Sequence, residues 1–278
     1  MLSIFHTVSQ GCSRLTTEHY SSSFSGAIRM LHKDLRAPIY NIYGFVRFAD
    51  EIVDTFHHCN KALLLQQFKE ETWLAIHRGI SLNPILHSFQ LTVNEYAIDR
   101  ALIESFFKSM EMDLQKQQYD CATYDEYIYG SAEVVGLMCL YVFCEGNGQQ
   151  YERLKPFAQA LGAAFQKVNF LRDLKADHQS LNRMYFPGMD FHNFTAGMKQ
   201  QIEEEIAADF RNAYKGVLQL PWKARFGVYV AYKYYISLFR KIRGMQPSQI
   251  LEQRVRIPGF QKTLIVLRAS VKSQLKLI

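Results

Sequence analysis

The chain has 278 residues, of which 48% are hydrophobic and 21% are charged. This balance provides enough apolar side chains for a substantial core and excludes wholesale disorder. Only seven prolines and fifteen glycines occur, and they do not gather into a linker, so we expect one domain over residues 1–278.

The cysteines and the hydropathy pattern bear on where the protein works. Five cysteines, an odd number without a Cys-x-x-Cys pair, are typical of a reduced intracellular protein rather than a disulfide scaffold. The N-terminus carries no basic region followed by an apolar run, and no stretch of about 18 uninterrupted apolar residues occurs. We therefore expect a cytoplasmic protein, either soluble or peripheral at the inner face of a membrane.

The net charge of +6 is concentrated toward the C-terminus. From Pro221 onward there are twelve lysines or arginines and one acid, Glu252. Such a segment faces anionic lipid, a phosphorylated substrate, nucleic acid or solvent alone. Because no recognised nucleic-acid-binding motif accompanies the charge, we expect no nucleic-acid partner. The aromatic-rich segment 224–239 and the basic segment after it favour peripheral contact with a membrane.

Helical periodicity dominates the chain from one end to the other. Apolar residues recur at helical spacing in the segments 62–76, 84–93, 98–114, 131–143, 156–176 and 224–242. Pro156 is typical of a first helical turn, and residues 146–148 are typical of a loop that ends a helix. Strand-like alternation is nearly absent, and segments 182–193 and 244–247 read as irregular. The pattern predicts an all-α, single-domain bundle of many helices.

The segment 40–54 places two carboxylates on one helix face. Asp50 and Asp54 are one turn apart, and Arg47 precedes Asp50 by three residues. The surrounding residues are apolar, so part of this helix is buried, where unpaired carboxylates are costly. A cation must offset them, and Arg47 alone could do so as an ordinary salt bridge.

A second polar stripe follows on the segment 166–177. Gln166, Asn169, Asp173 and Asp177 step by three and four residues along a helix that is otherwise apolar. This pattern indicates a buried polar network, a functional site, or a surface face that carries a salt bridge.

The two acidic stripes are more informative together than apart. Two helices that face each other with these carboxylates form a cage of oxygen ligands. Mg²⁺ prefers such ligands and completes its shell with substrate phosphates, and Mn²⁺ is an alternative. The nine histidines show no chelating spacing, which disfavours zinc.

At these residues the sequence resembles the squalene/phytoene synthase family, whose members join two prenyl diphosphates head to head (1–1′). The resemblance covers nearly the whole chain and is strongest toward the bacterial phytoene synthases. Its matching segments are 20–24, Tyr43 with Arg47, 50–54, 129–136, 169–177 and 183–187. The segment 169–177 is the most specific of them. The resemblance implies a helical bundle of the isoprenoid synthase type with a central cavity.

The resemblance also implies roles for individual residues. The expected metal ligands are Asp50, Asp54, Asn169, Asp173 and Asp177. The residues expected to bind substrate are Ser21, Ser23, Phe24, Arg47, Gln166, Asn169, Arg172, Tyr235 and Arg254. The expected catalytic residues are the four aspartates with Tyr43 and Tyr129. Gly136 and Ala164 are expected to shape the hydrocarbon channels. Glu133 departs from the family, which usually has glycine there, and it leaves the geometry near Tyr129 open.

The implied activity is the condensation of two C20 geranylgeranyl diphosphates to phytoene through a cyclopropylcarbinyl diphosphate, without NADPH. A squalene or dehydrosqualene synthase using two C15 farnesyl diphosphates is the alternative, and NADPH enters only with squalene. A non-catalytic assembly or lipid-binding relative would be expected to lose the acidic motifs, which this chain keeps. A terpene cyclase uses related acidic motifs but lacks support from the segments 21–24 and 183–187.

Overall fold

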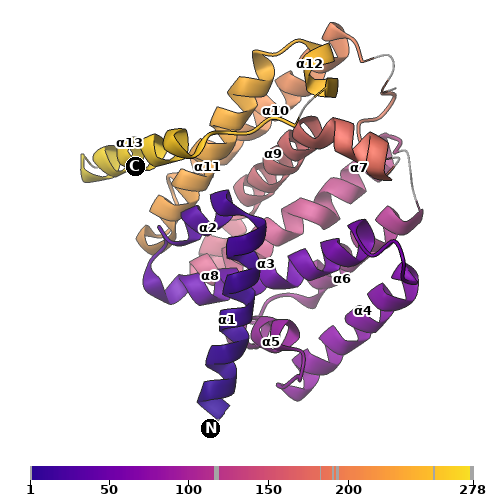
Figure 1. Ribbon diagram of the computed structural model, residues 1–278. Coiled ribbons are helices and arrows are strands. Elements are labelled where there is room, and N and C mark those ends of the chain that lie inside the picture. Colours follow the sequence, from indigo (N-terminus) through magenta and orange to yellow (C-terminus); the bar gives the residue numbers. More distant parts are fainter. Residues whose placement is uncertain are drawn as a thin grey trace.

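The computed structural model describes residues 2–115, 119–181, 183–189, 191, 194–252 and 254–275. Within these residues the regular elements are helices, packed side by side (Figure 1). They are α1 (Leu2–Tyr20), α2 (Ser22–Ile28), α3 (Lys33–Asp54), α4 (Lys61–Arg78), α5 (Pro84–Tyr96), α6 (Arg100–Gln115), α7 (Cys121–Ile128), the π-helical turn η1 (Tyr129–Glu133), α8 (Val134–Cys144), α9 (Gly148–Leu181), α10 (Ala196–Val217), α11 (Trp222–Arg243), α12 (Pro247–Glu252) and α13 (Gly259–Gln274). The predicted all-α bundle is thereby confirmed.

Local sequence explains where several helices begin and end. Asn60 and Asn83 cap α4 and α5 by accepting hydrogen bonds from backbone N–H groups of the first turn. Pro84 occupies the first turn of α5, where its missing N–H leaves no intrahelical bond unmade. After α8, Glu145 and Gly146 take positive φ angles of 46° and 85°, so the predicted helix-ending loop is confirmed.

One predicted helix boundary is wrong. Pro156 does not open a helix, because α9 already begins at Gly148 and includes Pro156 in its interior. Proline there removes one intrahelical hydrogen bond, which the surrounding packing must offset. α9 is 34 residues long, the longest helix described, and it lies against α8, α10, α11 and α12.

The core divides into two large groups of buried side chains. One lies among α3 to α6 and α8 and is centred on Phe45, whose ring is fully buried and stacks on Phe89 with 3.8 Å between the centroids. The other joins α7, α9, α10, α11 and α12 and includes Phe170, whose ring stacks on Tyr185 at 4.1 Å. α3 therefore belongs to the first group, whereas α9 contributes Tyr151 and Leu154 to the first group and its later part, from Ala163 to Leu174, to the second.

The most apolar stretch of the chain belongs to this interior. Cys121–Cys144 is 24 residues long and contains an 18-residue window with a mean hydropathy of 1.5, which is enough by length and composition to cross a membrane. Of its apolar window, 56% is buried in the fold, and α8 packs against α3, α6 and α9. Its composition is that of a central core helix.

Candidate active site

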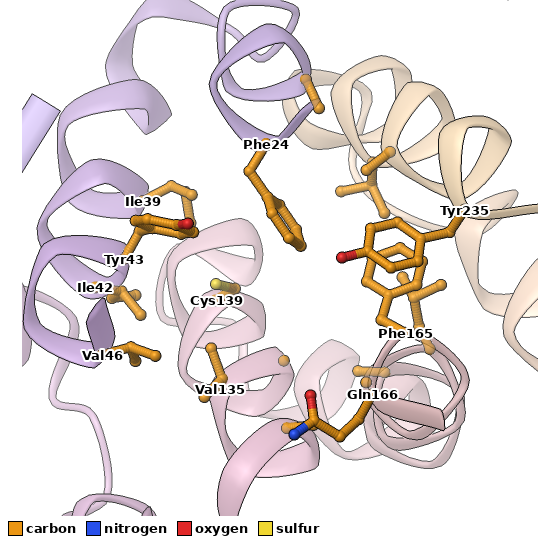
Figure 2. Close-up of a pocket in the computed structure, with 18 of the residues that line it drawn as sticks. Phe24, Ile39, Ile42, Tyr43, Val46, Val135, Cys139, Phe165, Gln166 and Tyr235 are labelled. Carbon is orange, nitrogen blue, oxygen red and sulfur yellow. The ribbon is translucent and has the colours of Figure 1, made fainter. Parts of the chain in front are cut away.

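A cavity of about 450 Å³ lies between α3 and α9 and is closed by α2, α8, α10 and α11. This volume falls within the range of small-molecule pockets. Figure 2 shows Ile39, Ile42, Tyr43 and Val46 of α3 on one side, and Phe165 and Gln166 of α9 with Tyr235 of α11 on the other. Phe24 of α2 points into the space between them.

One face of α9 forms a continuous wall of this cavity. The α9 residues that line it are Leu154, Phe157, Ala158, Leu161, Gly162, Phe165, Gln166, Asn169 and Arg172. They recur every three or four residues, as one face of a helix does. At 1.5 Å per residue, the stretch from Leu154 to Arg172 is about 27 Å long. The face is apolar at its beginning and becomes polar at Gln166, so the cavity has an apolar end and a polar end.

Charged and polar side chains from three segments lie at the polar end. Arg47 and Asp50 come from α3, Asn169 and Arg172 from α9, and Arg254 from the segment after α12. The Arg47 guanidinium lies 4.3 Å from the centre of the Tyr20 ring, pairs with Glu51 and stands 4.0 Å from Asp50. Of the predicted α3 and α9 residues, Arg47, Asp50, Asn169 and Arg172 therefore lie together at one end of one cavity.

Two of the predicted aspartates, Asp54 and Asp173, form ion pairs with arginines. Arg183 Nη1 donates to Asp54 Oδ1 at 2.7 Å. Asp173 is paired with its neighbour Arg172, whose Nε lies 3.0 Å from Oδ1, and with Arg254, whose Nε lies 2.6 Å from the same oxygen. Each of these carboxylates thus has a cationic partner from the chain itself.

The other two predicted aspartates, Asp50 and Asp177, are half-buried without such close partners. Burial, and then the nearby Asp54 carboxylate, raises the pKa of Asp50 to about 7. Burial, followed by Asp173 and Asp54, raises the pKa of Asp177 to about 8. Because Asp54 on α3 acts on Asp177 on α9, the two acidic stripes face each other closely enough to repel.

A buried acid that the sequence patterns did not reveal supports this arrangement. Asp113 of α6 lies 3.5 Å from Arg183 Nη1, accepts a hydrogen bond of 2.8 Å from Tyr127, and lies 3.4 Å from the hydroxyl of Tyr185. The Arg183 guanidinium also donates hydrogen bonds to the backbone carbonyls of residues 53 and 113, and the Arg183 backbone N–H donates to the carbonyl of Asp177. Arg183 therefore ties the ends of α3 and α9 to α6. Asp113 gives no periodic signal in the sequence, because no second acid lies three or four residues from it.

Aromatic rings surround the middle of the cavity. Phe165 and Tyr235 stack at 3.9 Å, and the Phe24 ring lies 5.8 Å from Tyr43 and 5.7 Å from Tyr235. The Tyr235 hydroxyl donates to Asn169 Oδ1 at 3.2 Å, which orients the amide. Burial and the Asp50 carboxylate raise the pKa of Tyr43 to about 12, so its hydroxyl keeps its proton at neutral pH. Gln166 donates to Ser131 at 3.3 Å.

Six of the expected positions lie outside the cavity lining: Asp54, Asp173, Asp177, Tyr129, Ser23 and Ala164. Tyr129 is half-buried on the far side of its helix, near Asp99 and Glu133, and the tyrosine that lines the cavity is Tyr127. The π-helical turn η1 changes the angular phase of the helix between Tyr127 and Gly136, which a 3.6-residue pattern does not anticipate. Ser23 is also absent from the lining, although Ser21 belongs to it, and Ala164 is fully buried in the core.

Glu133 and Gly136 define the wall near this turn. Glu133 accepts a hydrogen bond of 2.8 Å from Gln159 of α9 and does not line the cavity. Gly136 does line it, as expected, and a Cβ atom there would lie 3.1 Å from the Ala158 carbonyl oxygen. A Cβ atom at Gly162 would lie 2.7 Å from the Ala132 carbonyl oxygen, so only glycine permits this contact between α9 and η1.

The donor set at the polar end fits a hard divalent cation. Carboxylate oxygens from α3 and α9 and the Asn169 amide are the ligand types that Mg²⁺ and Mn²⁺ take. The mutual repulsion that raises the pKa values of Asp50 and Asp177 is the repulsion a cation would relieve. Among the described residues, no three His, Cys, Asp or Glu side chains are already gathered as a metal site.

Comparison with known proteins identifies the family. The model of the squalene/phytoene synthase family matches residues 17–261, and the chain belongs to this family. A presqualene diphosphate synthase of Rhodopseudomonas palustris is 29% identical over 191 residues, which are 68% of this chain and 65% of that protein. A phytoene synthase of Arthrospira platensis is 24% identical over 288 residues, which cover 94% of this chain and 92% of that one. The crystal structure of a dehydrosqualene synthase in complex with ligand shares the fold with a TM-score of 0.84, 18% identity and coverage of 98% of each chain.

Replacing Asp113 by Asn should destabilise the fold strongly. The change removes the buried negative charge beside Arg183, and breaking a buried ion pair costs about 3–5 kcal/mol. Urea unfolding of the metal-free protein measures this free energy. Glu18→Gln is the matched control, because it breaks an exposed pair with Arg14 whose expected contribution is about 0–1 kcal/mol. Equal losses for the two variants would contradict the role given to Asp113.

The raised pKa values of Asp50 and Asp177 predict a pH dependence of stability in metal-free protein. The folded state holds protons on these groups that the unfolded chain releases near pH 4, so their contribution to stability falls as the pH rises from about 4 to about 8. Unfolding free energies of the wild type in EDTA should therefore decrease over this range relative to the double variant Asp50→Asn/Asp177→Asn. If the unfolding free energies of the two proteins changed with pH in parallel, the raised pKa values of Asp50 and Asp177 would be refuted.

Proposed function

We propose that the chain catalyses the head-to-head (1–1′) condensation of two prenyl diphosphates, with two C20 geranylgeranyl diphosphates giving phytoene by way of a cyclopropylcarbinyl diphosphate. The observation that carries the proposal is the α9 face, which runs from an apolar end at Leu154 to a polar, charged end at Arg172. A prenyl diphosphate has the same division into a charged head and an apolar tail.

The diphosphate binds among the arginines of the polar end. Arg47, Arg172 and Arg254 present planar guanidinium groups there, which bind phosphate oxygens in bidentate fashion. Arg172 and Arg254 now pair with Asp173, and in the complex they turn to the diphosphate and release that carboxylate. Arg183 remains with Asp113, because both are buried.

The carboxylates of Asp50, Asp54, Asp173 and Asp177, with the Asn169 amide, would hold Mg²⁺, or Mn²⁺ in its place. Magnesium bound there neutralises the leaving diphosphate and so assists ionisation. The chain itself supplies the oriented amide of Asn169, fixed by Tyr235, and keeps the two acidic helices facing each other through the hydrogen bonds of Arg183 to the backbone carbonyls of Val53 and Asp177.

The apolar part of the cavity protects and stabilises the allylic cation. Its walls exclude water, which would otherwise hydrolyse the cation. The rings of Phe24, Tyr43, Phe165 and Tyr235 surround the middle of the cavity, and each aromatic face can stabilise a cation by about 0.5–2 kcal/mol. The Tyr127 hydroxyl is held by Asp113, which fixes a polar group in an otherwise apolar wall.

The length of the α9 face favours the C20 substrate. At about 1.2 Å per bond, an extended C20 prenyl chain measures roughly 18 Å and a C15 chain roughly 13 Å. The α9 face spans about 27 Å, and its polar end is taken up by the diphosphate. A C15 chain would leave more of the apolar end unfilled. Condensation of two C15 farnesyl diphosphates, with NADPH used only if squalene is the product, is the alternative that the product assay distinguishes.

Incubation with each prenyl diphosphate tests the proposal. The C20 substrate with Mg²⁺ should give a C40 product without NADPH, and EDTA or the variants Asp54→Ala and Asp177→Ala should reduce turnover by at least about 100-fold. Mass spectrometry of the product and far-UV circular dichroism of the variants are the measurements. An exclusively C30 product would overturn the C20 assignment, a cyclised single-substrate product would indicate a terpene cyclase, and absence of any metal-dependent turnover would overturn the enzymatic proposal.

The apolar end should set the length of the substrate. Leu154 lies at the beginning of the α9 face and is buried, so Leu154→Trp shortens the cavity there. We expect turnover of the C20 substrate to fall about tenfold or more relative to that of the C15 substrate, with the overpacking costing about 1–3 kcal/mol of stability. Competition between the two substrates measures the ratio directly. An unchanged ratio in a folded variant would show that the tail does not reach Leu154.

A further inference from the structure

Helix α13 has two apolar faces, of which the fold uses one. Its inner face packs on α11, with Ala269 buried and Ile265 and Val266 half-buried. The opposite face carries five exposed apolar side chains, which we call the outer stripe: Phe260, Leu264, Leu267, Val271 and Leu275. Their exposed fractions range from 42% for Leu264 to 72% for Phe260. Soluble chains rarely leave a continuous apolar stripe uncovered without a binding role.

The spacing of the outer stripe marks it as one surface. Its members are three or four residues apart, so they lie along a single side of the helix. In Figure 1, α13 projects away from the bundle on the side opposite α4. The stripe is therefore presented outward over the length of the helix.

Positive charge accompanies the stripe, and no negative charge does. Glu252 is the last acid of the sequence, and Arg254, Arg256, Lys262, Arg268 and Lys272 follow it within the described residues. Among the ion pairs of the described residues, none includes Arg268 or Lys272. The pKa of Lys233 on α11 is lowered, first by burial and second by the positive charges of Lys272 and Arg240. The second cause is expected where positive charge is left unbalanced.

The same segment leads directly to the cavity. Arg254 lines the polar end and pairs with Asp173, Val255 is buried, and α13 begins at Gly259. Lys262 donates to Ser22 at the start of α2, which also contributes Phe24 to the cavity. A surface bound along α13 therefore lies within a few residues of the polar end.

We propose that the outer stripe of α13 binds the surface of an anionic lipid bilayer. A basic helix with an apolar stripe lies in the interface of such a bilayer, with its apolar side chains among the acyl chains and its basic side chains at the headgroups. A second copy of the chain fits less well, because pairing two outer stripes would bring Arg268 and Lys272 of both copies together without a balancing acid. This inference goes beyond the proposed function, and its binding test needs neither substrate nor turnover.

Vesicle flotation of the full chain tests the proposal. Vesicles of phosphatidylcholine and phosphatidylglycerol in equal parts should bind the wild type, and vesicles of phosphatidylcholine alone should bind it far less. The double variant Leu264→Glu/Leu267→Glu should lose at least about tenfold in affinity for the anionic vesicles. Arg268→Gln and Lys272→Gln should each lose about fivefold, and added salt should weaken wild-type binding.

Matched controls come from α4, on the other side of the molecule in Figure 1. Leu63 is 50% exposed and Arg78 is exposed, so Leu63→Glu and Arg78→Gln make the same chemical changes away from the stripe and should leave binding unchanged. Equal binding by wild type and the Leu264→Glu/Leu267→Glu variant, or equal binding to both kinds of vesicle, would overturn the proposal. So would a lipid-free dimer, seen by light scattering, that this variant dissociates while its vesicle binding is unchanged. Turnover of detergent-dispersed substrate should be the same in wild type and variant, which separates this test from that of the proposed function.

Discussion

The confrontation of two acidic helices across one end of a cavity is the constraint on which the rest of the structure depends. Asp50 and Asp54 on α3 face Asp173 and Asp177 on α9, and their repulsion and burial raise two of the four pKa values. The fold holds them in place with arginines, since Arg183 pairs with Asp54 and Arg172 and Arg254 pair with Asp173. The first core group packs around α3 and the beginning of α9, and the second packs around the later part of α9, from Ala163 to Leu174.

Arg172 and Arg254 give this site a ligand-free state and a diphosphate-bound state. Without ligand, Arg172 and Arg254 neutralise Asp173, and with a bound diphosphate they serve as its ligands while the carboxylate turns to a cation. Arg183 differs, because it is buried against Asp113 and ties three helices together. It therefore maintains the geometry, whereas the more exposed Arg254 is free to exchange partners.

The helices and the acidic stripes could be predicted from the sequence because both repeat with the period of a helix. The α9 face extends that argument, since its apolar and polar halves share one periodicity from Leu154 to Arg172. Asp113 could not be predicted, because no second acid lies three or four residues from it to form a stripe, and the role of Arg183 depends on a segment without regular structure. Tyr129 was expected from the resemblance alone, whereas Tyr127 lines the cavity, and the π-helical turn that follows Tyr127 is not encoded in a 3.6-residue pattern. The prediction that Pro156 begins a helix was wrong, because α9 is long and well packed and tolerates a proline in its interior.

The most direct test is a crystal structure of the full chain with Mn²⁺ and an unreactive thio analogue of a prenyl diphosphate. The account predicts anomalous scattering from Mn²⁺ between α3 and α9, with oxygen ligands from both acidic stripes and the diphosphate held by Arg172. Mn²⁺ bound elsewhere, or carboxylates still paired with Arg183, Arg172 and Arg254 with no metal between the helices, would contradict it.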